Sequence, residues 1–319
     1  MDLIPESLAG KPVLVVLSTT LDDAPSGRGS IEELYAALQL NVMRHRQLRV
    51  YPSLAEMRQD RYKIGDIRAL DIIAQESPGE FAFRPKTCFG CSPCELGIDV
   101  DGQNVVKRSH SCGGNGVRTC PKSEAQKEVG CQRSKRQKTG TSAPIKPLGI
   151  GPNNPLLLHQ EYIPTFEELG EFRVFLCAPD DPQEDAEVIV AAFTKFGNDG
   201  MMMAREIRTS DFVWAGQDKK ARSAKETQLH RFAQHVYSQL CKRHDAHERY
   251  ESLKIGVRLD IGVSELSPNG LFFVNEVTRW HSADFFSRDV LSYPCLRICE
   301  KYGVSFATYI AKLWCQARD

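Results

Sequence analysis

The stretch "VRLDIGVSELSPNGLFFVNEVT", residues 257–278, decides the fold that we expect for this chain. Two apolar runs flank Pro268-Asn269-Gly270, and Asn-Gly between such runs is a strong hairpin signal. Each run carries one acidic residue, Asp260 in the first and Glu276 in the second. The sequence therefore predicts two neighbouring antiparallel strands on which two carboxylates converge.

Side-chain alternation along these strands predicts which residues share a face. On the first strand, one face carries Arg258, Asp260 and Gly262. On the second strand, one face carries Val274, Glu276 and Thr278, and the opposite face carries Asn275 and Val277. Carboxylates inside apolar strands are costly to bury unless a cation compensates, and Mg²⁺ prefers oxygen ligands. We therefore expect a magnesium site here; the alternative is that Asp260 pairs with Arg258 or Arg279 and only ties the sheet together.

A lysine and a glycine-rich loop form the second motif, in "NVVKRSHSCGGNGV", residues 104–117. Glycines allow consecutive backbone N–H groups to point at an anion, and Lys107 adds a positive charge. The loop supplies Gly113, Gly114 and Gly116. The motif predicts a phosphate cradle, although such glycines also form ordinary turns and the pattern matches neither a Walker loop nor a dinucleotide fingerprint.

A strand, a short connecting segment and a second strand form the third motif, in "LHQEYIPTFEELGEFRVFL", residues 158–176. The backbone around Tyr162 and Ile163 offers donors and acceptors to the rim of an adenine ring, beside Glu161. Glu171, at the start of the second strand, offers a carboxylate to ribose hydroxyls. The alternative is an ordinary β-hairpin.

The order of these motifs resembles the ATP-grasp superfamily, as in its carboxylate-amine ligases. The resemblance covers roughly residues 50 to 290. It implies an α/β fold in which two α+β lobes clasp a nucleotide, preceded by a short N-terminal α/β lobe. We expect the N-terminal lobe at 1–60, a central lobe at 61–165 with a Cys-rich and basic insert at 88–150, and a C-terminal lobe with the metal site at 166–319.

The resemblance also implies roles for residues that would hold ATP. Lys107 corresponds to the lysine that contacts the α-phosphate and the adenine edge, and residues 109–117 correspond to the flap over the phosphates. Lys63 corresponds to the upstream phosphate lysine. Glu161 and the backbone of Tyr162 and Ile163 would bind adenine, and Glu171 would bind ribose.

The hairpin residues take the remaining implied roles. Asp260 and Glu276 would hold Mg²⁺, and Thr278 stands where the family usually has an asparagine ligand. Arg258, two residues before the metal aspartate, would face the γ-phosphate or the acyl group. Arg258 and Lys107 are thus the candidate catalytic residues.

The implied activity is a Mg-ATP-dependent ligase that activates a substrate carboxylate as an acyl phosphate, which an amine or a thiol then attacks. Its partners would be a small-molecule or peptide carboxylate and an amine or thiol acceptor. Two alternatives stay open: a kinase on the same fold, and a non-catalytic interaction module stabilised by zinc.

The cysteine-rich run "CFGCSPC", residues 88–94, suggests the zinc site. Cys88, Cys91 and Cys94 have successive C-x-x-C spacings, which suit tetrahedral zinc if a fourth ligand comes from elsewhere. The candidates for the fourth ligand are His110, Cys112, Cys120 and Cys131. The alternative is a loop of reduced thiols.

The charge balance gives no general preference for nucleic acid or membranes, since the 319 residues include 41 Lys plus Arg and 41 Asp plus Glu. No stretch is apolar enough for a membrane span, and the eleven cysteines of a chain without a secretory start favour an intracellular protein. The basic run Arg133, Lys135, Arg136 and Lys138 is either a nuclear address or a solvated loop. We expect a mobile loop from Cys120 to Pro155.

Overall fold

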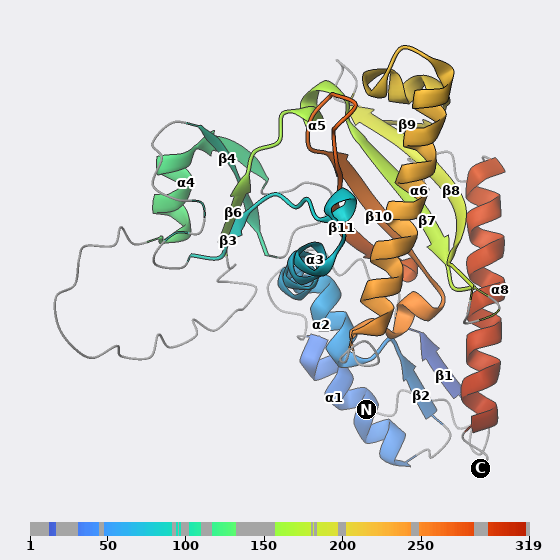
Figure 1. The fold of residues 1–319 in the computed structure, drawn as a ribbon. Coiled ribbons are helices and arrows are strands. Elements are labelled where there is room, and N and C mark those ends of the chain that lie inside the picture. The colour runs from blue at the N-terminus through green and yellow to red at the C-terminus, as the bar shows by residue number, and fades with distance from the viewer. Residues whose placement is uncertain are drawn as a thin grey trace.

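The structure, a computed structural model, describes residues 13–16, 31–44, 48–90, 94, 96, 102–109, 117–131, 157–179, 181, 184–196, 202–243, 249–283 and 293–316. The described strands form three sheets of two, five and four strands (Figure 1). The mixed α/β fold expected from the sequence is confirmed. The expected domain boundaries at residues 60/61 and 165/166 stay predictions.

The N-terminal part pairs two short parallel strands, β1 (Val13–Val16) and β2 (Leu48–Tyr51), joined through helix α1 (Ile31–Arg44) and followed by α2 (Leu54–Tyr62). Tyr51 attaches this unit to the rest of the molecule. Its hydroxyl accepts a hydrogen bond from Trp280 Nε1 at 3.1 Å, and its ring contacts Phe306 and Tyr309 of α8 (Tyr293–Gln316).

The five-stranded sheet is antiparallel throughout and has the order β11-β10-β7-β8-β9. Its strands are β7 (Glu171–Cys177), β8 (Glu187–Phe196), β9 (Met202–Glu206), β10 (Gly256–Val263) and β11 (Phe272–Arg279). Helix α6 (Lys219–Lys242) covers one face, against a core that includes Phe172, Val174 and Leu176. Helix α8 covers part of the other face, against Phe175 and Cys177 (Figure 1).

A bulge changes the expected alternation on β11. Asp260 lies opposite Glu276, but the next residue, Ile261, lies opposite Val274, so Asn275 is the extra residue of a β-bulge. From the bulge toward Phe272 every side chain therefore changes face. Val274 packs into the core beneath α6 and not beside Glu276, so the sequence prediction for Val274 and Asn275 was wrong.

The four-stranded sheet has the order β3-β6-β4-β5, with β3 (Thr87–Cys88), β4 (Gln103–Arg108), β5 (Arg118–Pro121) and β6 (Leu157–Glu161). Helix α4 (Lys122–Val129) packs on one face through Ala125, which contacts Val106 and Cys120. The loop expected from Cys120 onward was therefore wrong up to Val129. This helix is short and polar, and it is held by the docking of Ala125 on the sheet more than by its own apolar pattern.

Helix α3 (Ile64–Glu76) lies between α6 and the edge strand β11, and its Ala69, Leu70 and Ile73 join the core beneath α6. A single turn, α5 (Thr165–Glu168), connects β6 with β7. Within the ranges that the structure describes, none of the helices combines the length and apolar character needed to cross a membrane.

Candidate functional site

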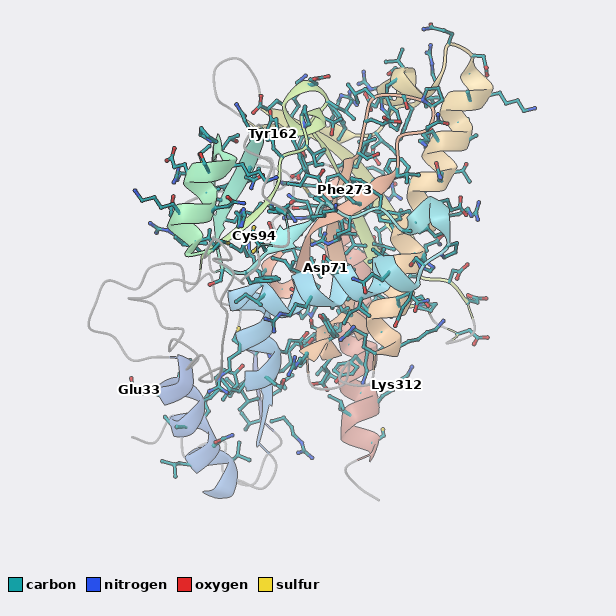
Figure 2. All side chains as sticks on the ribbon, turned by 60° about the vertical axis from the view of Figure 1, so that its left-hand side comes forward. Glu33, Asp71, Cys94, Tyr162, Phe273 and Lys312 are labelled. Carbon is teal, nitrogen blue, oxygen red and sulfur yellow. The ribbon has the colours of Figure 1, made fainter. Side chains whose placement is uncertain are left out.

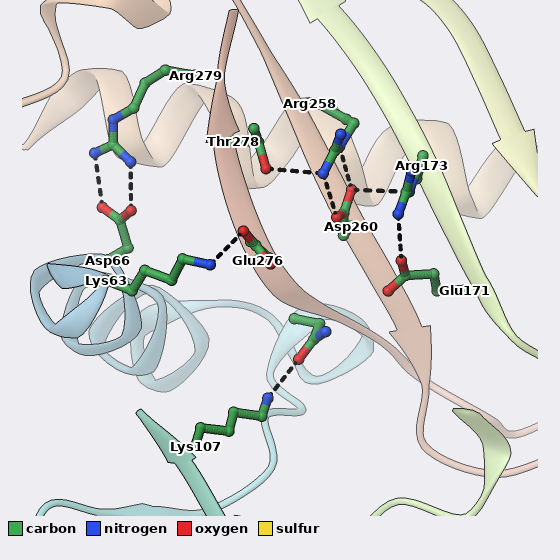
Figure 3. Close-up of polar contacts among 11 residues, drawn as sticks. Lys63, Asp66, Lys107, Glu171, Arg173, Arg258, Asp260, Glu276, Thr278 and Arg279 are labelled. Atoms are coloured by element: carbon green, nitrogen blue, oxygen red, sulfur yellow. Dashed lines mark hydrogen bonds and ion pairs between the residues drawn. The ribbon is translucent and has the colours of Figure 1, made fainter. Parts of the chain in front are cut away.

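Charged side chains from four strands and from the residue before α3 converge between the two larger sheets (Figure 3). The acidic ones come from β7, β10 and β11, and the basic ones from the residue before α3 and from β4, β7 and β10. The acidic members are Glu171, Asp260 and Glu276, and the basic members are Lys63, Lys107, Arg173 and Arg258. We call this group the charged cluster.

Asp260 and Arg258 are paired at the centre of the cluster. Arg258 Nε donates to Asp260 Oδ1 at 2.7 Å, and Arg258 Nη2 donates to Oδ2 at 2.8 Å and to Thr278 Oγ1 at 3.2 Å. Arg173 Nε lies 3.8 Å from Asp260 Oδ1. Burial would lower the pKa of Arg258, but Asp260 and the other carboxylates raise it well above its ordinary value. Of the two pairings expected as an alternative, the one with Arg258 is present, and Arg279 instead pairs with Asp66.

Glu276 and Lys63 form the second ion pair, with Lys63 Nζ 2.8 Å from Glu276 Oε1. Burial acts to raise the pKa of Glu276, but Lys63, Arg258 and Lys107 outweigh it and hold the pKa below its usual value. Lys63 directly precedes α3 and has left-handed backbone geometry, with φ of 50°. Left-handed geometry in a residue other than glycine stores strain and is common at functional sites.

Lys107 bridges the two sheets. Its Nζ donates to Gln160 Oε1 on the neighbouring strand and to Asn275 Oδ1 in the bulge of β11, each at 2.9 Å. Burial, together with the charges of Arg84 and Lys63, lowers the pKa of the Lys107 ammonium group from 10.5 to about 8. The neighbouring carboxylates, Glu276 and Glu171, thus do not fully offset the burial of this ammonium group.

Glu171 is a largely buried carboxylate, and its pKa is shifted upward, in the opposite direction to that of Lys107. Burial next to the negative charge of Asp260 raises its pKa from 4.5 to about 7, although Arg173 and Arg258 oppose the rise. Its closest basic group, Arg173 Nη2, lies 3.4 Å from Glu171 Oε1.

We expect Glu171→Gln to stabilise the protein in the absence of nucleotide. Because the pKa of Glu171 is raised by folding, the folded state binds more protons than the unfolded state between pH 4.5 and 7, and stability falls as pH rises through this window. The glutamine side chain of the variant does not titrate, so the variant does not lose stability in this way as pH rises. At pH 8 it should be more stable than the unaltered protein by about 1–3 kcal/mol. Urea unfolding at pH 5 and pH 8 measures the difference; a gain of equal size at both values would contradict the assignment.

The predicted adenine-binding segment follows β6. The carboxylate of Glu161 accepts a hydrogen bond from the backbone N–H of Lys86 at 3.2 Å, and the side chain of Ile163 is buried. Tyr162 lies on the side of the molecule that carries the four-stranded sheet, away from Lys312 on α8 (Figure 2). The adenine-binding role of these residues stays a prediction. The loop glycines Gly113, Gly114 and Gly116 lie outside the described residues, as does the basic run 133–138.

Three aromatic rings lie beyond Asp260 on the same face of the sheet. Phe273 packs edge-on against Phe83 and Phe166, with ring centroids 5.5 Å apart in both pairs. Phe273 lies directly opposite Gly262. A Cβ at Gly262 would come within 2.6 Å of the Phe273 ring and 2.8 Å of the Phe166 ring, so only glycine leaves room for this group. An apolar surface thus borders the charged cluster.

Sequence reasoning missed several members of this region. Asn275 was placed on the wrong face because the bulge was not foreseen, and Gln160 carries no motif of its own. Arg84 was missed too. Its Nε donates to Asp71 at 2.8 Å and its Nη1 donates to the carbonyl oxygen of Val274, while its Nη2 is buried without a partner among the described residues. Arg173 could have been predicted from the sequence, because side-chain alternation places it on the same strand face as Glu171.

The expected zinc ligands are only partly placed. Cys88 and Cys94 lie together, Cys91 lies outside the described residues, and the sulfur of Cys131 joins the first two. The fourth member is His159, which the sequence did not suggest. Cys120, another expected candidate, packs instead against Val106 and Ala125.

Comparisons with known proteins found only distant structural likenesses. No profile of a known protein family matches the chain, and no curated protein sequence matches it. Among solved structures, D-cycloserine synthetase DcsG has 14% identity and a TM-score of 0.45, over 85% of this chain and 77% of that one. An L-amino acid ligase from Bacillus licheniformis has 11% identity and a TM-score of 0.42, over 85% and 61%.

D-alanyl-alanine synthetase A from Vibrio cholerae has 11% identity and a TM-score of 0.44, over 88% of this chain and 70% of that one. These scores are too low to carry an argument about function, which rests on the geometry described above.

Proposed function

We propose that this protein is an ATP-grasp-like, Mg-ATP-dependent ligase that activates a substrate carboxylate as an acyl phosphate for attack by an amine or a thiol. One observation carries the proposal. Four cationic side chains from separate strands and a helix start surround three carboxylates in a largely buried site between two sheets (Figure 3).

The charges within this cluster favour a polyanionic ligand. Lys63, Lys107, Arg173 and Arg258 outnumber the three carboxylates, and Glu171 is only partly ionised near neutral pH. The lowered pKa of Lys107 and the raised pKa of Glu171 mean that each charge is poorly compensated in the protein alone. A triphosphate supplies negative charge to the lysines and arginines, and its bound cation supplies positive charge to the carboxylates.

The donor set fits Mg²⁺ at the hairpin. Asp260 and Glu276 lie directly opposite each other on adjacent strands, and both offer the hard oxygen ligands that Mg²⁺ prefers. Asp260 now binds Arg258 and Glu276 binds Lys63, so these two cations hold the carboxylates in place. Thr278 offers a hydroxyl beside them. When bound, the metal would neutralise the phosphate charge that develops during transfer.

The aromatic group of Phe83, Phe166 and Phe273 suits the base of the nucleotide. A purine combines an apolar face with a polar rim, and sites for such groups pair apolar walls with a few fixed polar atoms. The backbone after β6 offers the polar atoms at Tyr162 and Ile163, and Glu171 offers a carboxylate for ribose.

The residues of the cluster would act by position and charge. A substrate carboxylate oxygen attacks the γ-phosphorus, the bond to the β-phosphate oxygen breaks, and ADP leaves. The amine or thiol then attacks the carbonyl carbon of the acyl phosphate, loses its proton, and expels phosphate. Lys63, Lys107 and Arg258 would stabilise the negative charge on the phosphoryl oxygens in both steps.

Binding of Mg-ATP is the first test of this function. A ligand that binds only the folded state adds about 2.7 kcal/mol at 100 times its Kd, so Mg-ATP should raise the unfolding temperature clearly. Lys107→Met should lose most of this shift, whereas Lys219→Met, at an exposed position on α6, should keep it. If Mg-ATP did not raise the unfolding temperature of the unaltered protein, the proposal would be wrong.

The pH dependence of binding gives a second prediction for Lys107. Its protonated form attracts phosphate, so affinity should fall as pH rises through about 8, where the ammonium group loses its proton. The fall approaches about tenfold per pH unit above the pKa of the free protein. Lys107→Arg keeps its charge and should show a flat profile over pH 7–9. Calorimetric titration with Mg-ATP measures both; identical profiles would contradict the role of Lys107.

Product analysis then tests the reaction class. Panels of carboxylates and amines are incubated with Mg-ATP, and ADP and phosphate are followed together. A ligase releases free phosphate along with the amide or thioester product. Phosphate that stays attached to a stable acceptor would instead identify a kinase.

A further inference from the structure

Three cysteines and one histidine form a compact group away from the charged cluster. The ligand atoms of Cys88, Cys94, Cys131 and His159 all lie within 4.8 Å of one another. Cys88 Sγ is 3.4 Å from Cys131 Sγ, and His159 Nε2 is 3.4 Å from Cys94 Sγ and 3.2 Å from Cys131 Sγ. Cys88 and His159 are buried, with no measurable exposed fraction.

We propose that these four residues are a structural zinc site. Three thiolates and an imidazole are the ligand set of many structural zinc sites, and tetrahedral geometry with Zn–S bonds of ~2.3 Å separates sulfur atoms by roughly 3.8 Å. The separation of the Cys88 and Cys131 sulfur atoms, 3.4 Å, is a few tenths of an ångström shorter, and all four ligand atoms lie within 4.8 Å of one another, so the ligands need only small movements. All four positions would be filled by protein, which leaves no open position for a substrate and excludes a catalytic role for this metal.

The site does not follow the double C-x-x-C pattern of the sequence. Its members come from β3, from the segment that follows β3, from the second residue beyond α4, and from β6. His159 lies opposite Cys88 in the ladder between β6 and β3, so their side chains share a face of the sheet. The ladder thus pairs one cysteine with the histidine before any metal is bound.

Two glycines bring the other cysteines to this pair. Gly90 has φ of 81°, and a Cβ there would lie 2.7 Å from the carbonyl oxygen of Val129 at the end of α4. Gly130 has φ of 79° and ends α4, and the N–H of Cys131 donates to the carbonyl oxygen of Gln126 at 2.9 Å. Because both glycines adopt left-handed geometry, the backbone at Gly90, just after β3, passes close to the end of α4.

Asn104 supplies the support that a zinc-bound histidine needs. Its side-chain amide lies 2.8 Å from His159 Nδ1 and is buried. The Asn104 atom placed there is the amide nitrogen Nδ2, and because zinc on Nε2 leaves the proton on Nδ1, the amide must turn over so that its Oδ1 accepts that proton. In that orientation the amide fixes the histidine in the tautomer that binds the metal.

The position of the site indicates which elements the metal would hold together. In β6, the side chain of His159 points to the face of α4, and that of the next residue, Gln160, points to the opposite face, where it binds Lys107. A metal on His159 would therefore hold β6 and α4 together directly behind the residues that we assign to ATP. This site does not depend on the proposed ligase activity.

Metal analysis of the full chain tests the site without any use of ATP. Protein purified without chelator should carry about one zinc per chain. Replacement by Co²⁺ should give the thiolate-to-cobalt absorption in the near ultraviolet and the intense visible bands of a tetrahedral site. Both signals should disappear in Cys131→Ser. Cys120→Ser alters a buried cysteine of the same sheet that is not a ligand, and it should keep the full zinc content.

A conservative second variant keeps the test valid if Cys131→Ser fails to fold. Asn104→Ala leaves all four ligands in place and should weaken zinc binding by about 10–100-fold, as measured by competition with a chromophoric chelator. Zinc below about a tenth of an equivalent, with no tetrahedral cobalt spectrum after titration of the reduced protein, would overturn the proposal. A Cys88–Cys131 disulfide in freshly purified protein, found by thiol counting, would overturn it as well.

Discussion

Glu276→Gln is expected to abolish the Mg²⁺-dependent part of ATP binding and to lower turnover by about 10²–10³-fold, the typical cost of losing one group that stabilises transition-state charge. The substitution keeps the size of the side chain but removes the negative charge that Lys63 and the proposed metal share. It also removes one of the two carboxylates that lie opposite each other in the hairpin.

The measurement compares ATP with Mg²⁺ and ATP with a chelator, by calorimetric titration of both proteins. In the unaltered protein Mg²⁺ should strengthen binding, and in Glu276→Gln the two titrations should coincide. Glu265→Gln is the matched control, because Glu265 is exposed in the loop of the same hairpin. If Mg²⁺ still strengthened ATP binding in Glu276→Gln, Asp260 and Glu276 would not be a metal site.

Arg279→Met is expected to lower the free energy of unfolding by about 3–5 kcal/mol, because it removes one partner of a buried ion pair and leaves the other charge uncompensated. Arg279 is fully buried. Its Nη1 and Nη2 donate to the two oxygens of Asp66 at 2.5 and 2.9 Å, and its Nε lies 3.7 Å from Glu56 Oε1. Asp66 is in the first turn of α3, so this pair ties β11 to the helix that Lys63 precedes.

The loss should grow with pH. Burial already raises the pKa of Glu56 to about 7, although Arg279 and Ser252 oppose the rise. Without Arg279 the pKa rises further, so the folded state binds a proton that the unfolded state releases above pH 4.5, and stability falls as pH increases.

Urea unfolding at pH 5 and pH 8 tests this expectation. Lys301→Met serves as the control, because the ion pair of Lys301 with Glu187 has a similar length of 2.8 Å but both side chains are about half exposed. Exposed pairs contribute about 0–1 kcal/mol, so this control should change little. Equal losses in the two variants would show that burial does not decide the contribution of Arg279.

Local sequence patterns predicted the hairpin, because the residues that specify its turn and its two strands lie within one short stretch. The Pro-Asn-Gly turn and the alternating acidic residues predict two paired strands, and Asp260 does lie opposite Glu276. The same reasoning failed at Asn275, the residue next to Glu276. A bulge depends on how a strand fits its partner and the core beneath it, and it reverses the face of every residue beyond it.

Contacts between distant segments could not be foreseen in the same way. His159 has no cysteine near it in the sequence, and it meets Cys88 only because β6 pairs with β3. The expected motifs included Lys63 by resemblance, but its pairing with Glu276 depends on the fixed position of α3. Arg84 belongs to no motif, and only the folded chain places it beside Asp71 and the carbonyl group of Val274.

By itself, the sequence determined the α/β class, the hairpin and the order of the motifs, because turn residues and side-chain alternation act between neighbours along the chain. Only the tertiary structure decided which charges meet. It turned Asn275 toward Lys107, paired Asp260 with Arg258, and gathered three cysteines around His159. The physical reason is that burial and electrostatic interactions depend on distance in space, which the packing of strands and helices fixes and local sequence does not.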